Sequence, residues 1–527
     1  MDSTTSTTAL SLTAISDEQR DGRPFTIPAL QEWTPGPTDY VFNAQTRIVL
    51  DRRAASQLHA TAVVFADDLY VLSGIRVPLT IGAVLREGDI FLTLDAGASI
   101  TGHEGYLLES GSTLTLRAST DAGVFYATRT VLQLLTQDAI IPGGVARDWP
   151  DYPERSLMVD MGRKYFSVEW LENHIRELAY LKYNYFHFHL SDNYGFRLES
   201  ERHPEIVSPE HYSKAELRSL LALAQKYHIT IVPEIDMPGH MDTILAAHPT
   251  LQLTSPQGNR RSGDIDLAQD ASYQLMRDLL EEYIPLFPGP YWHIGADEYI
   301  MQDDYERYPQ LLEYAREHYG PEANIKDTYL GFVNWANEIV KAHGKITRAW
   351  NDGLYGGSAV QVANDIIFEH WFRSGLEPQE IVNLNLSIMN GNADHLYYVL
   401  GNNWRALPDG IYHAFEHHVF HGTATIDIYH PCNLGAKLHV WCDNPVLETE
   451  EEIAQGIACS LRSLAQKNWG SRKLVPDYER FLPIIARIGH APGFTGQALG
   501  IHEETRHQQT SVSLAEAMMP PASNEQA

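Results

Sequence analysis

Eight short apolar runs recur within residues 155–443, and most of them are followed by an amphipathic helical pattern. The strand-like runs are LMVDMG, YFHFHLSD, ITIVPEID, YWHIGADE, ITRAWND, IIFEHW, LSIMNGN and KLHVWCD; the connections after the fifth, sixth and seventh are less clearly helical. Helices between strands bring the chain back to the same edge of a sheet, so the strands pair in parallel. Eight such repeats predict a (β/α)8 barrel. An open doubly wound sheet is the alternative, but no glycine-rich dinucleotide fingerprint opens a helix here.

The sequence pattern of residues 22–148 differs from that of the barrel and predicts a separate, small α+β domain. Short β-rich runs (TRIVLD, LYVLSGI, IFLTLD, YLLESG and STLTLRA) are separated by Gly, Asp or Ser and indicate strands. The run DAGVFYATRTVLQLLTQD has helical spacing of its apolar residues. We expect the barrel to occupy residues 149–500, with a disordered leader over 1–21 and a polar tail over 501–527.

Charge and cysteine content restrict the classes of partner. Lys+Arg total 39 and Asp+Glu 68, which gives a formal net charge of −29. Such an acidic surface repels phosphate backbones and anionic lipids, so nucleic-acid and membrane-surface roles are disfavoured. The three cysteines do not form a disulfide framework. The N-terminal stretch makes a poor secretory signal, and no apolar run reaches about 18 residues. We therefore expect a cytoplasmic protein.

Carboxylates and tryptophans gather where the predicted strands end. They are Asp160, Asp192, Asp236, Asp297 with Glu298, Trp350 with Asp352, Glu369 with Trp371, and Trp441 with Asp443. One such end would be ordinary turn chemistry, but seven are not. Aromatic faces stack on pyranose rings, while carboxylates accept hydroxyl hydrogen bonds and transfer protons. The pattern predicts a sugar site at the carboxyl-terminal face of the barrel.

The sharpest motif is HIGADE, residues 293–298, in which two adjacent acids close a strand. A two-carboxylate glycosidase usually takes its acids from separate positions about 5–10 Å apart. An adjacent pair indicates that the two acids have roles other than those of the usual pair of carboxylates. Taken alone, the dipeptide is better explained by an N-cap Asp followed by a first-turn Glu.

HIGADE resembles the H-x-G-G-D-E signature of the family 20 glycoside hydrolases, the β-N-acetylhexosaminidases. Further motifs match that family in the same order: RSLMVDMGRKYF, HFHLSD, PEIDMPGH, WND, EHW and WCD, with GYLLES and AGVFYATRTVLQLL in the N-terminal unit. The resemblance covers roughly residues 30–490. It implies an exo-acting, retaining enzyme that removes terminal β-linked N-acetylglucosamine or N-acetylgalactosamine, with no cofactor and no metal.

The family's substrate-assisted mechanism, in which the substrate's 2-acetamido oxygen attacks the anomeric carbon, gives the adjacent acids different roles. By resemblance, Glu298 is the general acid and base, and Asp297 orients the acetamido group and offsets its developing charge. Tyr398, with Tyr397 as second choice, would hydrogen-bond the acetamido oxygen. The resemblance also implies sugar-binding residues (Arg155, Trp350, Trp371, Trp441 and Asp443) and residues that support the acids from behind (Asp192, His240 and His293).

Two departures and two alternatives stay open. Ala296 replaces the second glycine of the signature, and the Y-x-D pattern expected near the seventh strand is here Tyr398-Val399-Leu400. A metal-dependent hydrolase would instead use histidines and acids such as His187, His189, Asp236 and His240 as ligands. A non-catalytic sugar-binding protein is the other alternative, although binding alone does not need both acids. The preferred hexosamine, release of one sugar or two, the glycan and the oligomeric state are not determined.

Overall fold

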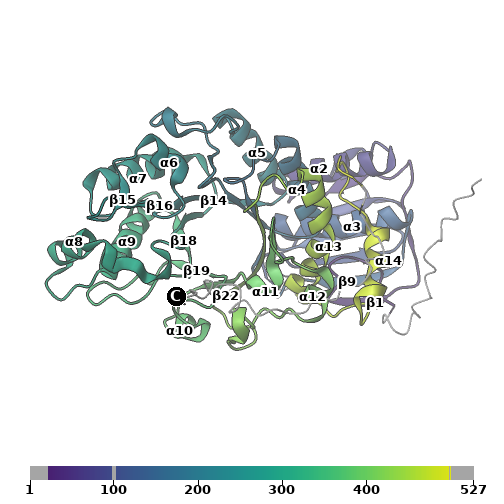
Figure 1. Ribbon diagram of the computed structural model, residues 1–527. Helices are drawn as coiled ribbons and strands as arrows, with labels where there is room; N and C mark the ends of the chain where they lie inside the picture. The colour runs from purple at the N-terminus through teal and green to yellow at the C-terminus, as the bar shows by residue number, and fades with distance from the viewer. Residues whose placement is uncertain (1–21, 96, 98–101, 498, 500–527) are drawn as a thin grey trace, which may run out of the picture.

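The computed structural model describes residues 22–95, 97, 102–497 and 499. In this part of the chain a small N-terminal domain lies beside a barrel (Figure 1). The predicted leader (1–21) and the predicted tail (501–527) lie outside the described residues, so both stay predictions.

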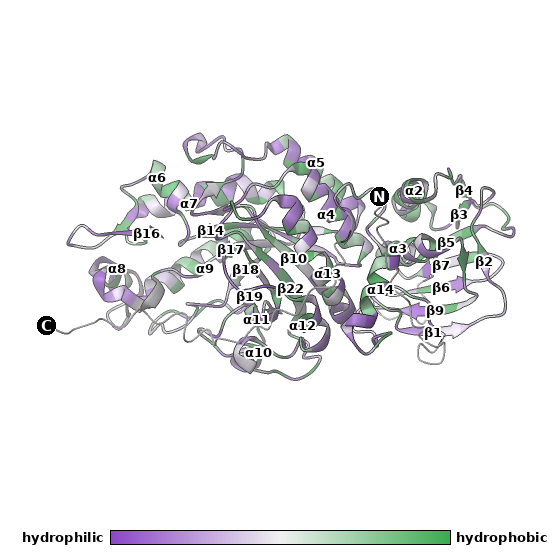
Figure 2. Ribbon diagram, turned by 45° about the vertical axis from the view of Figure 1, so that its right-hand side comes forward, coloured by the Kyte–Doolittle hydropathy of each residue, from purple (hydrophilic) through white to green (hydrophobic). Residues whose placement is uncertain are grey.

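The N-terminal domain consists of a seven-stranded mixed sheet covered by two helices, α2 (Ala55–Ser73) and α3 (Asp121–Gln137). Helix α3 is buried along most of its length because it packs between its own sheet and the barrel helices α4 and α14 (Figure 2). The strands, in sheet order, are β1 (Glu32–Pro35), β9 (Gly144–Asp148), β6 (Tyr106–Ser110), β7 (Leu114–Ala118), β5 (Ile90–Leu94), β3 (Ile48–Leu50) and β4 (Leu79–Ile81); β2 (Tyr40–Val41) pairs separately with β8 (Ile140–Ile141).

One predicted strand of this domain is wrong. The run LYVLSGI, residues 69–75, forms the last turn of α2 and the residues after it. Leu58, Ala62, Phe65 and Leu69 are all buried at a spacing of three to four, which is the period of a helix face. A short apolar run does not distinguish the end of such a helix from a strand.

All eight predicted barrel strands are present, pair in parallel and close into a ring. Leu157 on the first strand faces Phe186 on the second and Leu438 on the last, so the first strand joins the two ends of the sheet. A ninth strand, β21 (Tyr397–Val399), pairs in parallel with the carboxyl end of the last strand. The eight are β10 (Glu154–Asp160), β11 (Tyr185–His189), β14 (Thr230–Met237), β17 (Tyr291–Gly295), β18 (Ile346–Trp350), β19 (Ile367–His370), β20 (Ile388–Asn390) and β22 (Asn433–Trp441).

Long helices follow the strands where the sequence predicted them: α4 (Val168–Tyr180), α5 (Lys214–Lys226), α7 (Asp270–Tyr283), α9 (Lys326–Ala342) and α13 (Glu450–Trp469). The predicted capping box at the start of α5 is confirmed, with Ser213 and Glu216 each bonding the other's backbone. The remaining elements are short or lie in connections: α6 (Asp242–Ala247), α8 (Pro309–Tyr319), α10 (Pro378–Asn383), α11 (Ala393–Leu396), α12 (Pro408–His413), α14 (Tyr478–Ile488), β12 (Ser191–Asp192), β13 (Gly195–Phe196), β15 (Gln252–Thr254), β16 (Arg260–Ile265), η1 (Pro204–Ile206), η2 (Ile284–Leu286), η3 (Met301–Arg307) and η4 (His421–Thr423).

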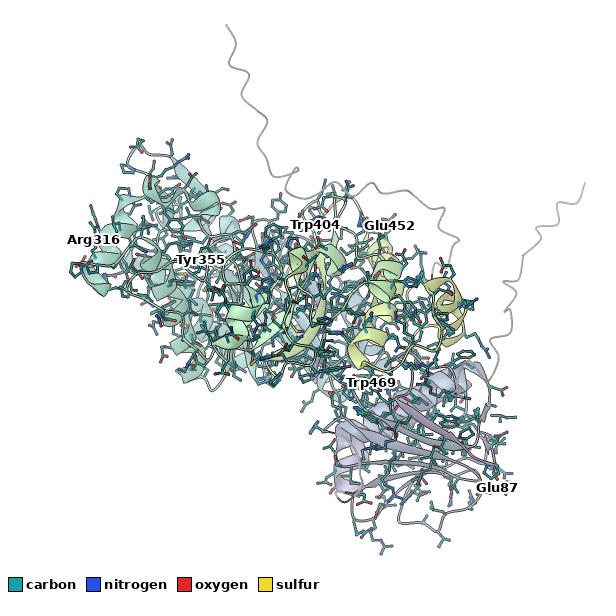
Figure 3. All side chains as sticks on the ribbon, turned by 90° about the horizontal axis from the view of Figure 1, so that it is seen from below. Glu87, Arg316, Tyr355, Trp404, Glu452 and Trp469 are labelled. Atoms are coloured by element: carbon teal, nitrogen blue, oxygen red, sulfur yellow. The ribbon has the colours of Figure 1, made fainter. Side chains whose placement is uncertain are left out.

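A buried polar cluster joins the two domains. Lys182 forms a 2.8 Å ion pair with Asp148 of β9, and both side chains are fully buried. Trp469, at the end of α13, donates its indole N–H to the same carboxylate at 2.8 Å, and Figure 3 shows this tryptophan where the barrel meets the N-terminal domain. These contacts fix the small domain against the amino-terminal end of the barrel and leave the carboxyl-terminal end open.

Two features bear on the compartment. Among the described residues, no helix has both the length and the apolar character needed to span a membrane. The three cysteines, Cys432, Cys442 and Cys459, all lie in this part of the chain and form no disulfide with one another. The cytoplasmic location stays a prediction.

Candidate active site

A cavity of about 560 Å³ opens where the barrel strands end. It brings together the predicted residues Asp297, Glu298, Trp350, Trp371, Trp441, Asp443 and His240, and it also contains Tyr397. The structure does not place Arg155, Tyr398, Asp192 or His293 among the lining residues. Aromatic walls around a few convergent carboxylates are suited to a pyranose ring.

The backbone turns sharply after β17 to present the two acids. Gly295 and Ala296 both have positive φ, 72° and 71°, and so does Glu298 at 52°. Position 295 requires glycine, because a Cβ there would lie 1.7 Å from a carboxylate oxygen of Asp236. Ala296 adopts the left-handed conformation that glycine occupies without penalty, at a cost of about 1–2 kcal/mol. The departure from the family signature therefore keeps the turn and adds strain to it.

Asp297 lies deep in the pocket against a second carboxyl group, that of Asp236. Burial, followed by the negative charge of Asp297, raises the pKa of Asp236 well above its ordinary value. The raised pKa favours the neutral form of Asp236, and that form can donate a hydrogen bond to Asp297. Burial also raises the pKa of Asp297 itself to about 7, although His240 opposes that shift.

Glu298 is nearer the mouth of the pocket, with 28% of its side chain exposed against 12% for Asp297. Its backbone N–H donates to Asp352 at 2.7 Å, and its carboxylate lies 3.3 Å from Nε2 of His240. Burial favours a higher pKa for Glu298, but the hydrogen bond and charge of His240, together with the charge of Arg163, outweigh burial and lower the pKa. Glu298 is thus held by His240 through its carboxylate and by Asp352 through its backbone N–H.

His240 connects the acid pair to a chain of charges behind it. Burial disfavours its imidazolium, but the carboxylates of Asp297 and Asp192 outweigh burial and raise its pKa to about 10. Nδ1 of His240 lies 3.7 Å from Asp192, which Arg163 contacts at 3.1 Å. His240 thus lies between Asp192 and the acid pair, and the supporting role that the resemblance implies for both residues stays a prediction.

Tryptophans form the walls, and buried carboxylates fix two of them. Trp350 donates its indole N–H to Glu234 at 2.8 Å, and Trp371 donates to Asp352 at 2.8 Å. The ring of Trp371 is nearly parallel to that of Tyr397, with centroids 5.9 Å apart. With Trp441, these rings form an aromatic floor, in which indole hydrogen bonds hold Trp350 and Trp371.

The register of β21 decides between the two candidate tyrosines. Alternate strand residues point to opposite sides, and Tyr397 and Val399 face the cavity. Tyr398 points away and donates its hydroxyl to Glu448 at 2.6 Å. The geometry thus favours the second choice, Tyr397, as the residue that meets a ligand. It also places Val399, not Leu400, where the Y-x-D pattern would have its acid.

Arg155 lies at the wrong end of the barrel to bind a sugar. It is the second residue of β10, is fully buried and forms a 2.7 Å ion pair with Glu104 of the N-terminal domain. The arginine that lines the cavity is Arg163, eight residues later, beyond the carboxyl end of the same strand. It lies 3.0 Å from Asp160 and 3.7 Å from Asp443. The sequence motif contained both arginines, and only their position relative to the strand end separates them.

Two further residues of the site, Asp236 and Asp352, carried a signal that was not used. Both are strand-ending acids, but the family resemblance assigned neither a role, and Asp236 was considered only as a metal ligand. Asp352 contacts the backbone of Glu298 and the indole of Trp371, and burial raises its pKa to about 6. Strand-end position was thus a better guide than the individual motif.

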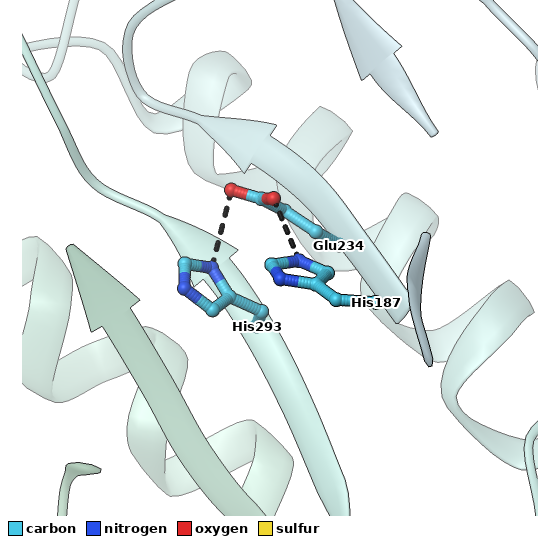
Figure 4. A group of neighbouring side chains, drawn as sticks. All are labelled: His187, Glu234 and His293. Carbon is cyan, nitrogen blue, oxygen red and sulfur yellow. Dashed lines mark ion pairs between the residues drawn. The ribbon is translucent and has the colours of Figure 1, made fainter. Parts of the chain in front are cut away.

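One donor group of the metal-site alternative, the group around His187, lies against the charge of a neighbouring lysine. Figure 4 shows His187 and His293 on either side of Glu234, at 2.8 and 3.1 Å. The ammonium of Lys437 lies 2.8 Å from Nδ1 of His187 in the same fully buried space. Burial and this lysine lower the pKa of His187 to about 3. A divalent cation would face that ammonium at close range, so the donor set does not fit a metal. His293 thus belongs to the layer beneath the aromatic floor.

Comparison with known proteins identifies the family. The family model described as glycosyl hydrolase family 20, catalytic domain, matches residues 152–439, and domain 2 of the same family matches residues 23–149. The chain therefore belongs to glycosyl hydrolase family 20.

Individual relatives agree. A lacto-N-biosidase from Bifidobacterium bifidum is 29% identical over 486 residues, which is 89% of this chain and 42% of that protein. A beta-N-acetylhexosaminidase from Cellulomonas fimi is 30% identical over 312 residues, 55% of this chain and 62% of that protein. The chain spans less than half the length of the first curated relatives it matches. An exo beta-N-acetylglucosaminidase structure from Vibrio harveyi superposes with a TM-score of 0.73 at 21% identity, covering 88% of this chain and 77% of that one, and supports the fold.

Proposed function

We propose that the protein is an exo-acting β-N-acetylhexosaminidase that hydrolyses terminal β-linked N-acetylglucosamine or N-acetylgalactosamine with retention of configuration. The observation that carries the proposal is the adjacent acid pair, with Asp297 deep against the aromatic floor and Glu298 nearer the mouth. Two carboxylates so placed are suited to different parts of one ligand. Several relatives are named beta-hexosaminidase, which agrees with this proposal.

The reaction would proceed in two steps with the substrate's acetamido group as nucleophile. The acetamido oxygen attacks the anomeric carbon while Glu298 protonates the leaving oxygen, giving a bicyclic oxazolinium and a free alcohol. Water then attacks the anomeric carbon, Glu298 removes its proton, and the acetamido group is regenerated. Asp297 would accept the acetamido N–H and offset the positive charge, while the Tyr397 hydroxyl would bond the acetamido oxygen.

Before substrate binds, the pKa values favour the proton of the acid pair on Asp297 rather than on Glu298. Asp297, with its pKa near 7, is the more basic carboxylate, while His240 keeps Glu298 ionised. Catalysis needs Glu298 protonated and Asp297 ionised. A bound acetamido N–H stabilises ionised Asp297, and a sugar ring over Glu298 removes water from it and raises its pKa. Substrate binding would therefore transfer the proton to the residue that uses it.

Release of a disaccharide is the second candidate. Val399 gives the cavity an apolar wall near Trp404, where a carboxylate would bind hydroxyls of a terminal ring. A sugar that carries another sugar on that side has no free hydroxyl there to bind. A carboxylate at position 399 would then be buried without a partner, whereas a valine would not. The B. bifidum relative that matches 89% of this chain is named a lacto-N-biosidase.

A panel of nitrophenyl glycosides tests both candidates. It contains N-acetylglucosamine, N-acetylgalactosamine, plain glucose, and N-acetylglucosamine carrying a β-linked galactose on its 3-hydroxyl. The proposal predicts turnover of acetamido sugars and negligible turnover of the plain glucoside. Faster release of the intact disaccharide than of the single sugar would support the second candidate. Efficient cleavage of the plain glucoside would contradict both.

A further inference from the structure

A second His–Glu–His group lies at the surface of the barrel, outside the active site. His203 immediately precedes η1, Glu205 lies within it, and His248 directly follows α6. Nδ1 of His203 lies 3.1 Å from Oε1 of Glu205, and Nε2 of His248 lies 3.0 Å from the same oxygen. The three candidate ligand atoms lie within 4.8 Å of one another. Two imidazoles therefore converge on one carboxylate oxygen from separate segments of the chain.

The two imidazole–carboxylate contacts are hydrogen bonds in the absence of an ion, and their lengths also fit ligands around one transition-metal ion. Zinc–nitrogen bonds of about 2.0–2.1 Å and zinc–oxygen bonds of about 2.0–2.2 Å place the two ligand atoms about 2.9–3.4 Å apart at ligand angles between 90° and 109°. The observed 3.0 and 3.1 Å fall in that range. The imidazoles are 16% and 26% exposed and the carboxylate 43%, so an ion and its remaining water ligands have access.

A neighbouring carboxylate supplies an independent observation. Oδ2 of Asp278, on α7, lies 3.4 Å from Nε2 of His203, the ring nitrogen that does not face Glu205. Metal-binding histidines usually donate their other N–H to a carboxylate, which fixes the tautomer and raises the basicity of the ligand. Arg202 and Gln274 hold Asp278 in place at 3.1 Å each. The group therefore has an outer shell as well as an inner one.

We propose that His203, Glu205 and His248 bind a divalent transition metal of the zinc class, with Asp278 as the supporting carboxylate. Two imidazole nitrogens favour zinc, nickel or copper over calcium and magnesium, which prefer oxygen ligands. The contrast with the buried group in Figure 4 is informative, because there Lys437 occupies the space beside the imidazoles. No cationic side chain forms a recorded ion pair with Glu205 among the described residues; its ion-pair partners are the two histidines.

Zinc binding to the full, tag-free chain tests the proposal. Equilibrium dialysis against zinc chloride at neutral pH should show one more bound equivalent in the unmodified protein than in His248→Gln or His203→Gln. Asp278→Asn should keep the site but weaken it by about 10–100-fold. His318→Gln, which changes an exposed histidine on α8, is the matched control and should keep the full stoichiometry. Equal stoichiometry in the unmodified protein and His248→Gln would overturn the proposal.

Crystals of the unmodified protein soaked in zinc remove any dependence on the folding of the variants. Anomalous scattering at the zinc edge should show a peak about 2.0–2.2 Å from Nδ1 of His203, Nε2 of His248 and a carboxylate oxygen of Glu205. Absence of a peak at this group would overturn the proposal. The readout is independent of hydrolysis, so failure of the proposed function would leave it intact.

Discussion

The two ends of the first barrel strand carry the same chemistry with different consequences. Arg155 at the amino end and Arg163 beyond the carboxyl end both lie beside carboxylates, the first fully buried and the second 15% exposed. Their guanidinium groups lie 5.3 Å from the Trp469 ring and 5.4 Å from the Trp441 ring. Beyond Arg155 lies the N-terminal domain, and beyond Arg163 lies the cavity. The comparison teaches that position along a barrel strand, rather than residue type, separates a structural joint from a ligand site.

The largest effect is expected at the open end, from Glu298→Gln. Without a general acid the leaving group departs as an alkoxide, so turnover of natural glycosides should fall by roughly 10²–10⁴. The loss should be smaller for nitrophenyl glycosides, whose leaving groups need little protonation. The matched control is Glu104→Gln at the closed end, which should keep the kcat of the folded protein. Equal losses on both kinds of substrate would argue against the acid role.

The next prediction concerns substitution of Arg155 at the closed end of the barrel. Arg155→Met removes a buried guanidinium that bonds Glu104 and the backbone of Lys182 and Tyr152, so the free energy of unfolding should fall by about 3 kcal/mol. Urea denaturation measures this change, while kcat/KM of the folded variant should stay near that of the unmodified protein. Arg163→Met should instead lower kcat/KM by at least about tenfold, since it removes charge-assisted contacts at the site. Loss of activity in a stably folded Arg155→Met would contradict the comparison.

Asp297→Asn sharpens the comparison inside the site. The change keeps the size of the side chain but removes the negative charge opposite the developing oxazolinium. Loss of such a preorganised interaction costs about 2.7–4 kcal/mol, or roughly 10²–10³ in kcat. KM should change much less, because the charge develops mainly in the transition state. Steady-state kinetics with an N-acetyl glycoside measures both, and a variant altered only in KM would show that Asp297 acts in another way.

The pH dependence of kcat/KM should show the smallest effect, about tenfold per pH unit beyond each limb. The active pair holds one proton. That proton is lost as pH rises through the Asp297 pKa of about 7, so activity should fall above this value. A second proton binds only when pH falls through the lowered pKa of Glu298, which sets the acidic limb. In Asp297→Asn the alkaline limb should move into the acidic range, because only Glu298 then titrates. An unmoved limb would show that another group causes it.

Most of the fold could be predicted from the sequence because seven of the eight barrel strands are apolar runs that end in an acid or a tryptophan. The same use of short apolar runs wrongly predicted a strand at the end of α2. Five apolar residues taken alone do not reveal the helical spacing of the buried residues in the preceding turns. Tyr397 and Tyr398 differ only in which face of β21 they occupy, and the pairing with β22 that sets this register is non-local. Arg155 was chosen over Arg163 because a motif does not show where its strand ends. Asp236 and Asp352 gain their importance from contacts with Asp297 and Glu298 that form only when the barrel closes.

Inhibition by a thiazoline analogue of the N-acetyl sugar tests the central claim most directly. This molecule mimics the bicyclic intermediate that forms only when the acetamido group is the nucleophile. The account predicts an inhibition constant lower than that of N-acetylglucosamine by about 10² or more, as expected for an analogue of the transition state. Inhibition no tighter than by N-acetylglucosamine, together with a trapped glycosyl ester on Asp297 or Glu298, would contradict it.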